Sequence, residues 1–178
     1  MVATKARALG RLFDIGIGAV PQLLNGSGFT GKVISMQNCE GVTIFFVKNA
    51  VGTTDDFICN LQEINGAGGT PRDLDIITTY YKKTETALDN DEAWVEVTQS
   101  AASNITAIAG TAELEMMFVV EVRADQLSDG YTHIGLDMAD WGNTDAQYGT
   151  VIYIPWGLKV QRAPANLPSL KAPGVANA

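Results

Sequence analysis

The stretch from Glu113 to Asp140 constrains the fold of this chain most strongly. In its first half, strongly apolar residues alternate with more polar ones. The apolar residues are Leu114, Met116, Phe118, Val120 and Val122. A period of two indicates a β-strand with one buried face. After an Asp-Gly turn, Ile134, Leu136 and Met138 repeat the pattern. We therefore expect a two-stranded core unit in which the second strand returns along the first.

Further short strands are expected on both sides of this unit. The run Val42–Val47, VTIFFV, is apolar on both faces apart from Thr43. Such a run predicts a strand covered on both sides, by a second sheet on one face and by arms or partners on the other. Other strand patterns cover 33–34, 57–62, 74–83, 94–98, 150–154 and 158–161, with Pro155 expected to interrupt the strand before it. The strands at 74–83 and 94–98 are expected to form a hairpin with an extended tip.

These patterns predict an all-β fold, an antiparallel β-sandwich or jelly-roll-like domain of about eight strands. The chain has 178 residues, 18 glycines and six prolines, which suits one domain of short strands joined by turns. Residues 1–29 are expected to be an N-terminal arm that could form a short helix, and 30–162 the sandwich domain. Residues 163–178 read as a Pro/Ala-rich C-terminal tail. No apolar run approaches the ~18 residues that span a bilayer.

The charges divide unevenly between these three zones. The whole chain has a net charge of −8, which argues against nucleic acid or an anionic membrane as a partner. Three basic residues and one acidic residue lie in 1–29, and one basic residue lies in 163–178, so the middle carries a net −11. Basic ends on an acidic body suit docking to an acidic surface or to a neighbouring copy. The equally weighted alternative is that terminal extensions happen to be basic.

Candidate catalytic groups are sparse. The only histidine, His133, falls on the strand face opposite Ile134, so we expect it to face solvent or a subunit contact. General-base catalysis would need a nucleophile or carboxylate beside it, which the sequence does not indicate. Cys39 and Cys59 are expected to be free and buried, although adjacent strands could bring them together. One histidine and two separated cysteines do not predict a zinc site.

Acidic loops are the better metal candidates. One group is Asp89, Asp91 and Glu92, and the other is Asp137, Asp140 and Asp145. Calcium binds several loop oxygens, but neither group has the EF-hand spacing, so solvated turns are the favoured interpretation. The glycine clusters lack the setting of a phosphate-binding loop. We therefore predict no catalytic residue, no metal, no cofactor and no enzymatic activity.

Aromatic residues offer one alternative to a purely structural interpretation. The set consists of Tyr80, Tyr81, Trp94, Trp141 and Trp156. In β domains such residues are mostly core or interface anchors, which is the interpretation we favour. The alternative is a platform on which sugars stack.

Three segments together resemble a known group of proteins. They are Thr79–Lys83 with the Trp94–Thr98 strand and the following QSAAS, then Val119–Asp140, then Gly149–Pro168. In this order and spacing they resemble small head-associated structural proteins of tailed bacteriophages, of the capsid decoration or cement type, encoded near the major capsid protein. The resemblance covers roughly residues 35–168, and its motifs are structural rather than catalytic.

The resemblance implies a non-enzymatic virion protein that binds the bacteriophage capsid and stabilises it. Terminal arms would contact major capsid protein or neighbouring copies, and the expected contact residues are Arg7, Arg11, Leu12, Phe13, Leu167, Leu170 and Lys171. The protein is expected to form a homo-oligomer, either a trimer or a dimer. It is expected on the capsid surface in the virion and in the host cytoplasm during assembly. The alternatives are a carbohydrate-binding or adhesion module on a virion and a hydrolase built from carboxylates.

Overall fold

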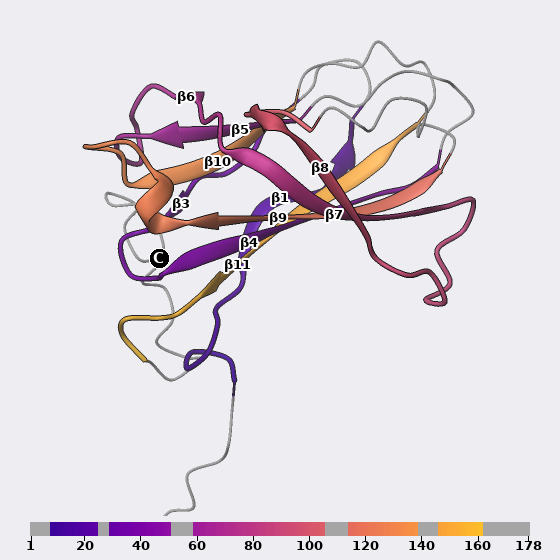
Figure 1. The fold of residues 1–178 in the computed structure, drawn as a ribbon, viewed down its shortest axis with the longest axis horizontal. Helices are drawn as coiled ribbons and strands as arrows, with labels where there is room; N and C mark the ends of the chain where they lie inside the picture. Colours follow the sequence, from indigo (N-terminus) through magenta and orange to yellow (C-terminus); the bar gives the residue numbers. More distant parts are fainter. Residues whose placement is uncertain (1–7, 25–28, 51–58, 106–113, 139–145, 162–178) are drawn as a thin grey trace, which may run out of the picture.

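The computed structural model describes residues 8–24, 29–50, 59–105, 114–138 and 146–161. These residues form short strands and one turn of 3-10 helix (Figure 1). The elements are β1 (Gly16–Leu23), β2 (Phe29–Thr30), β3 (Ile34–Ser35), β4 (Gly41–Lys48), β5 (Cys59–Ile64), β6 (Arg72–Asp73), β7 (Ile77–Glu85), β8 (Val95–Ala102), β9 (Glu115–Arg123), η1 (Ala124–Gln126), β10 (His133–Met138) and β11 (Tyr148–Trp156).

The strands build two antiparallel sheets packed face to face. The six-stranded sheet has the order β1-β11-β4-β9-β7-β8, and the five-stranded sheet has the order β2-β10-β5-β6, with β3 also paired to β10. This arrangement confirms the expected all-β, antiparallel sandwich. The jelly-roll description stays a prediction.

The core lies between the two sheets and is made by alternate residues. On β4, Ile44 and Phe46 are fully buried, and the Phe46 ring lies 4.9 Å from the Phe118 ring of β9. The opposite sheet contributes Leu61 and Ile134, which are equally buried. Each such side chain contributes roughly 1.5–3 kcal/mol when it leaves water, so the period-two pattern accounts for the stability of the sandwich.

The prediction that the strand after the Asp-Gly turn returns along its predecessor is wrong. Both strands form, as β9 and β10, but β9 pairs with β4 and β7, whereas β10 pairs with β2, β3 and β5. The chain crosses from one sheet to the other through η1 and the turn at 128–131. The apolar faces of β9 and β10 therefore meet across the core, which buries both faces against a partner layer.

Several expected boundaries also change. The hairpin of 74–83 and 94–98 is confirmed as β7 and β8. Pro155 does not interrupt β11, because its carbonyl accepts a hydrogen bond from Asp14 N (2.9 Å) and it pairs with Val42. The strand expected at 158–161 does not form among these described residues. The arm expected at 1–29 contains β1, which pairs with β11 and is therefore part of the sheet.

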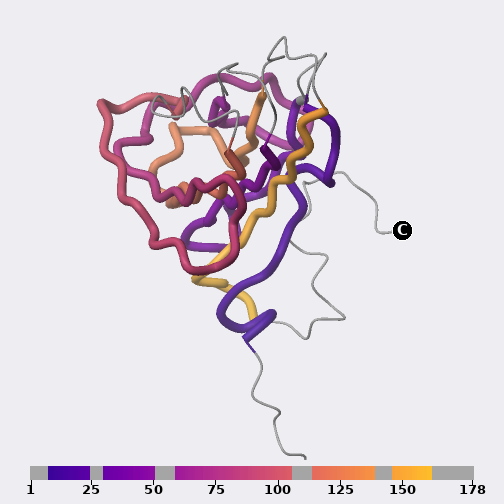
Figure 2. The backbone as a smooth tube through the Cα atoms, turned by 90° about the vertical axis from the view of Figure 1, so that its right-hand side faces the viewer, coloured from indigo at the N-terminus to yellow at the C-terminus, as the bar shows by residue number. Residues whose placement is uncertain are grey.

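The N-terminal segment 8–13 lies beside the end of β11. Phe13 forms a β-bridge with Trp156, and Leu12 N donates to Ala8 O (2.8 Å), which closes a turn. In both views the indigo segment and the yellow end of β11 lie side by side at one end of the sandwich (Figures 1 and 2). The chain thus enters the six-stranded sheet from a turn anchored on that sheet.

His133 is buried, and the prediction that it faces solvent or a subunit contact is wrong. The residue is 0% exposed, and its backbone pairs with Ser35 on β3 and Ile64 on β5, so it lies on an interior strand of its sheet. Thr132 Oγ1 lies 2.8 Å from His133 Nδ1, whereas Nε2 has no hydrogen-bond partner among the described residues. Burial lowers the pKa of His133 below its ordinary value of 6.5, because a charged imidazole would lose its hydration.

We expect His133 to make the fold sensitive to mild acid. Above pH ~6.5 the ring is neutral in both states; as pH falls below that value, the unfolded chain takes up a proton that the folded chain resists. The free energy of unfolding should therefore fall by up to about 1.4 kcal/mol per pH unit until the lowered folded-state pKa is reached. Denaturant unfolding between pH 7.5 and 5.0 measures this slope, which His133→Leu should reduce and Thr132→Val should retain. Equal slopes in all three proteins would contradict the assignment.

Candidate functional site

The face of the six-stranded sheet that points away from the core carries apolar side chains across five neighbouring strands. We call it the outer face. Backbone register places Ile17, Ile152, Phe45, Val119 and Tyr81 in one row, on β1, β11, β4, β9 and β7. Ile17 is 45% exposed and Tyr81 38%, and the three between them are half-buried. This central row has no second layer over it among the described residues.

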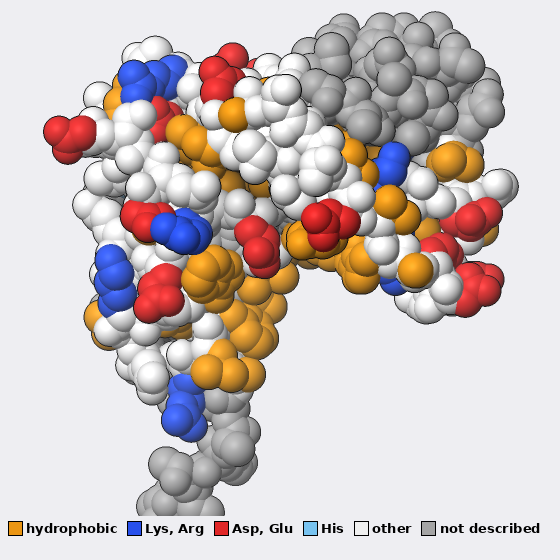
Figure 3. Space-filling model, viewed as in Figure 1, with side chains coloured by type: hydrophobic (Ala, Val, Ile, Leu, Met, Phe, Trp, Pro, Cys, Tyr) orange, Lys and Arg blue, Asp and Glu red, His pale blue; other side chains and the backbone are white. Residues whose placement is uncertain are grey.

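Two flanking rows extend the outer face. On one side Thr150, Val47 and Met117 lie together, and on the other side Ile154, Thr43 and Glu121 lie together. Figure 3 shows hydrophobic side chains lining the hollow between the N-terminal end of the sheet and the β7–β8 hairpin. Scattered apolar residues on a surface are ordinary, but a contiguous apolar face indicates a surface that binds another molecule.

The edge strand β1 continues this apolar surface. Ile15 and Val20 are more than half exposed, and Leu23 is 44% exposed. The pairing of β1 with β11 shifts register twice, and Pro21 lies within the strand. A proline and bulges are the usual means by which an edge strand avoids pairing with another chain. The side chains of β1, rather than its backbone, are therefore the part available for binding.

Three of the expected contact residues lie together at this end. Leu12 is 66% exposed, Arg11 is exposed, and Phe13 is half-buried through its bridge to Trp156. Asp14 behind them is buried and accepts a hydrogen bond from Ile15 N (2.8 Å), and burial raises its pKa. Arg7, Leu167, Leu170 and Lys171 lie outside the described residues.

Two grooves open where the outer face ends, on either side of Arg123 and Trp156. The larger, about 570 Å³, is lined by Cys39, Glu40, Arg123, Ala124, Asp125, Trp156 and Lys159. The smaller, about 290 Å³, is lined by Ile76, Ile77, Thr78, Thr79, Tyr81, Glu121, Arg123, Gln126 and Trp156. Trp156 packs over Gly41, where any side chain would collide with the indole ring.

The titratable groups of the larger groove are poorly suited to acid–base or nucleophilic chemistry. Arg123 Nε donates to Asp125 (2.9 Å), and this hydrogen bond holds the pKa of Asp125 below its ordinary value, so the carboxylate stays ionised. Burial raises the pKa of the Cys39 thiol to about 11, which keeps it protonated and unreactive at neutral pH. The groove therefore offers shape and charge for binding.

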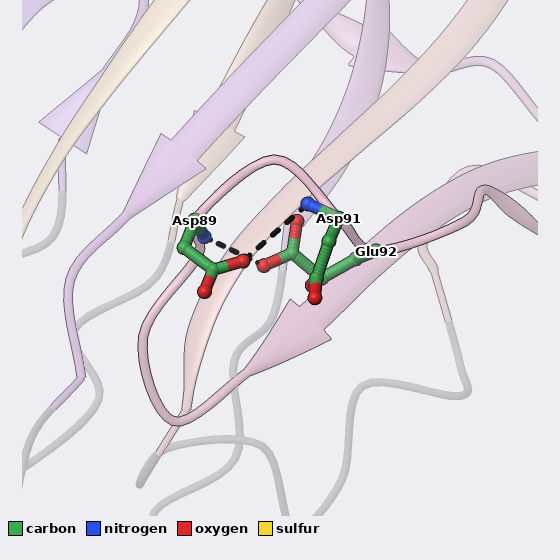
Figure 4. A group of neighbouring side chains, drawn as sticks. All are labelled: Asp89, Asp91 and Glu92. Atoms are coloured by element: carbon green, nitrogen blue, oxygen red, sulfur yellow. Dashed lines mark hydrogen bonds between the residues drawn. The ribbon is translucent and has the colours of Figure 1, made fainter.

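The first acidic loop forms a compact cluster in the β7–β8 hairpin (Figure 4). One candidate oxygen from each of Asp89, Asp91 and Glu92 lies within 4.8 Å of the others. Glu92 accepts hydrogen bonds from Asp89 N (2.7 Å) and Asn90 N (3.2 Å), so its carboxylate caps the loop backbone. The hydrogen bond to Asp89 raises the pKa of Asp91, as expected when two carboxylates share a proton.

The second acidic group is only partly described. Asp137 accepts a hydrogen bond from Thr30 Oγ1 (3.0 Å), which ties β10 to β2. Asp140 and Asp145 lie outside the described residues. Calcium binding by either group stays a hypothesis, and the hydrogen bonds given above join these carboxylates to the loop backbone, to each other or to Thr30.

The cysteines and aromatics lie mostly as expected. Cys39 and Cys59 are both free and buried, which confirms the favoured interpretation. Tyr80 is in the core, whereas Trp94 is 45% exposed at the hairpin, with Lys83 Nζ 5.2 Å from the centre of its ring. Trp141 lies outside the described residues.

A buried carboxylate that sequence patterns did not reveal joins three segments. Glu63 is 1% exposed and accepts hydrogen bonds from Arg72 Nε (2.7 Å) and Ser128 N (2.8 Å). The Arg72 guanidinium also lies 4.0 Å from the centre of the Tyr131 ring. Burial alone would raise the pKa of Glu63, but the hydrogen bonds from Ser128 and Arg72 outweigh it and lower the pKa. This cluster fixes the crossover between the sheets, because it links β5 and β6 to the turn before β10.

Two consecutive phenylalanines provide a matched test of which face is the core. Phe46 is 0% exposed and Phe45, on the opposite side of β4, is half-buried. In dilute solution Phe46→Ala should lower the free energy of unfolding by about 3–5 kcal/mol, and Phe45→Ala by about 1 kcal/mol. Urea unfolding followed by circular dichroism measures both. Equal losses would mean that the outer face is covered within a single chain.

No protein-family model, curated protein or solved structure matches this chain. Among the described residues no helix is long and apolar enough to cross a membrane. What the outer face and the N-terminal segment bind is therefore argued from their own chemistry.

Proposed function

We propose that this chain is a non-enzymatic structural protein of a bacteriophage virion that binds the capsid and stabilises it, as a cement or decoration protein does. The observation that carries the proposal is the N-terminal segment, where Leu12 is 66% exposed beside the exposed Arg11. An apolar anchor next to a cation, on a chain with a net charge of −8, suits a contact with another protein. The resemblance to head-associated phage proteins is the reason for proposing that the bound protein is the capsid.

The geometry of the segment supports a docking role. Phe13 is bridged to Trp156, and Gly10 N donates to Phe13 O (2.8 Å), so the turn is held against the sheet before any partner binds. A surface fixed in its bound shape loses little conformational entropy on association. Leu12 can therefore contribute its apolar surface to the interface at low cost.

Stabilisation would follow from binding alone. A protein that binds the assembled capsid and not its separated subunits shifts the equilibrium toward assembly. Many copies on one particle act together, so each contact can be modest. In this role major capsid protein is the partner, the capsid surface is the location, and the host cytoplasm is where assembly takes place.

One observation favours the second candidate, a carbohydrate-binding or adhesion module on a virion. Trp156 lines both grooves, and the larger one also carries Glu40, Asp125 and Lys159. Sugars bind where an aromatic ring lies beside such polar groups. Glycan binding that is lost in Trp156→Ala, together with no affinity for capsids, would favour this candidate.

Capsid binding tests the proposal directly. Purified protein is mixed with capsids of a tailed phage whose genome encodes this chain, and occupancy is measured by co-sedimentation. The double variant Arg11→Glu, Leu12→Glu should weaken binding by about tenfold or more, because it removes the anchor and reverses its neighbouring charge.

The matched control is Lys32→Glu, Val95→Glu, which makes the same kinds of change at exposed positions outside the segment, with Val95 on β8 at the opposite edge of the sheet from β1. It should bind as the unaltered protein does. Deletion of 163–178 tests the C-terminal contact separately, whereas deletion of 1–29 would remove β1 and disturb the sheet. Full occupancy by the Arg11, Leu12 variant would sink the proposed N-terminal contact.

A further inference from the structure

The outer face carries opposite charges on the two sides of its central row. Glu121 on β9 lies in the row beside Thr43, one step from Val119 toward the end of that strand. Lys83 on β7 pairs with Met117, one step from Val119 in the other direction. Both are outside the core, Glu121 exposed and Lys83 half-buried. The apolar row thus has an anion on one flank and a cation on the other.

The shape of the outer face also has two complementary directions. A twisted sheet is saddle-shaped, curving toward the viewer along one diagonal and away along the other. Figure 3 shows the hollow direction, which runs between the N-terminal end of the sheet and the β7–β8 hairpin. When a copy is turned by 180° about an axis that crosses the strands, its raised diagonal lies over the hollow diagonal of the first copy. The two saddle-shaped faces therefore fit together.

We propose that the outer face binds a second copy of this chain, in a two-fold symmetric dimer whose axis runs along the central row. In that dimer Phe45, Val119 and Ile152 each meet the same residue of the second copy, and apolar surface is buried along the row. The rotation carries Glu121 over Met117 of the second copy and beside its Lys83. Because the interface is isologous, this ion pair forms twice.

The same rotation gives the smaller groove an occupant. The hairpin end that holds Lys83 and Trp94 is brought over the groove lined by Thr79, Tyr81 and Glu121 of the second copy. Trp94 is 45% exposed in a single chain, and its ring already carries Lys83 5.2 Å above it. Tryptophans that enter such grooves commonly dominate the energy of an interface.

The available area suits a stable homodimer. Strands about 4.8 Å apart and rows about 6.8 Å apart give roughly 600 Å² per copy for three rows across the sheet. Contact of the hairpin with the groove brings this toward the ~800 Å² per partner of a standard interface. The inference concerns the purified chain alone and holds whether or not the proposed capsid binding is correct.

Charge exchange tests the dimer. Sedimentation velocity at about 1–100 μM should give unaltered protein at twice the 19.0 kDa mass of the chain. Glu121→Lys and Lys83→Glu should each raise the dissociation constant about tenfold or more, because each places like charges together twice. The double variant should return to within about threefold of the unaltered protein, since the pair is restored in reverse. Trp94→Ala should weaken association by about tenfold or more.

The controls are Asp129→Lys and Lys32→Glu, which make the same charge changes at exposed positions outside the outer face. Both should dimerise normally, and circular dichroism should show every variant folded. A monomer at all concentrations would overturn the proposal. So would a double variant no better than the two single ones, because the charges would then not face each other.

Glu96 tests the direction of the axis. It pairs with Tyr81 and so ends the central row at the rim of the outer face. The proposed axis brings the two Glu96 carboxylates toward each other, a repulsion that water and salt only partly screen. Glu96→Gln should therefore tighten the dimer by about two- to threefold at low salt, and more weakly at high salt. Unchanged or weaker association at low salt would exclude this axis.

Discussion

A two-layer sandwich can bury only one face of each sheet, and this limit governs much of what the chain does with its surface. The strands β4, β9 and β11 carry large apolar side chains on both faces. One set closes the core around Phe46 and Phe118, which lie in contact. The other set is left outside, where it costs free energy unless a second molecule covers it. The same alternation therefore produces both the fold and the candidate binding surface.

The ionisable groups near the core follow the same division. Burial lowers the pKa of Lys48 to about 8 while its ammonium donates to Leu114 O (2.8 Å), and burial raises the pKa of the Cys59 thiol and the Tyr153 hydroxyl. In each case burial shifts the equilibrium toward the uncharged form, but Lys48 still carries its charge at neutral pH. Glu63 differs because two donors stabilise its charge, and it lies where the chain changes sheets. Among the described residues, burial thus disfavours charge, and the buried charges of Lys48 and Glu63 are stabilised by hydrogen bonds.

Sequence patterns predicted the strands better than their partners. Local patterns, which are alternation in β9 and β10 and runs of strand-forming residues in β4 and β7, located these strands because they depend only on neighbours along the chain. The sheet that a strand joins depends on distant segments. The same limit explains why His133 was predicted to be exposed, because its neighbours on β3 and β5 are distant in the sequence. The edge strand β1 was missed because its glycines and Pro21 do not resemble a strand pattern. For the candidate site, Arg11, Leu12 and Phe13 are consecutive along the chain, and their role as contact residues stays a prediction. The run VTIFFV indicated that one strand has a second apolar face. The extent of the outer face across five strands follows only from their register in the structure.

The irregular edge of β1 has a consequence for the size of any assembly. Pro21 cannot donate a backbone hydrogen bond, and the two register shifts break the straight ladder that an added strand would need. Copies therefore cannot extend the sheet sideways from this edge into a fibre. A face that meets its own copy about a two-fold axis is occupied by the first partner and is not available to a third copy. At this edge of the sheet, the chain therefore favours a closed pair over an open polymer.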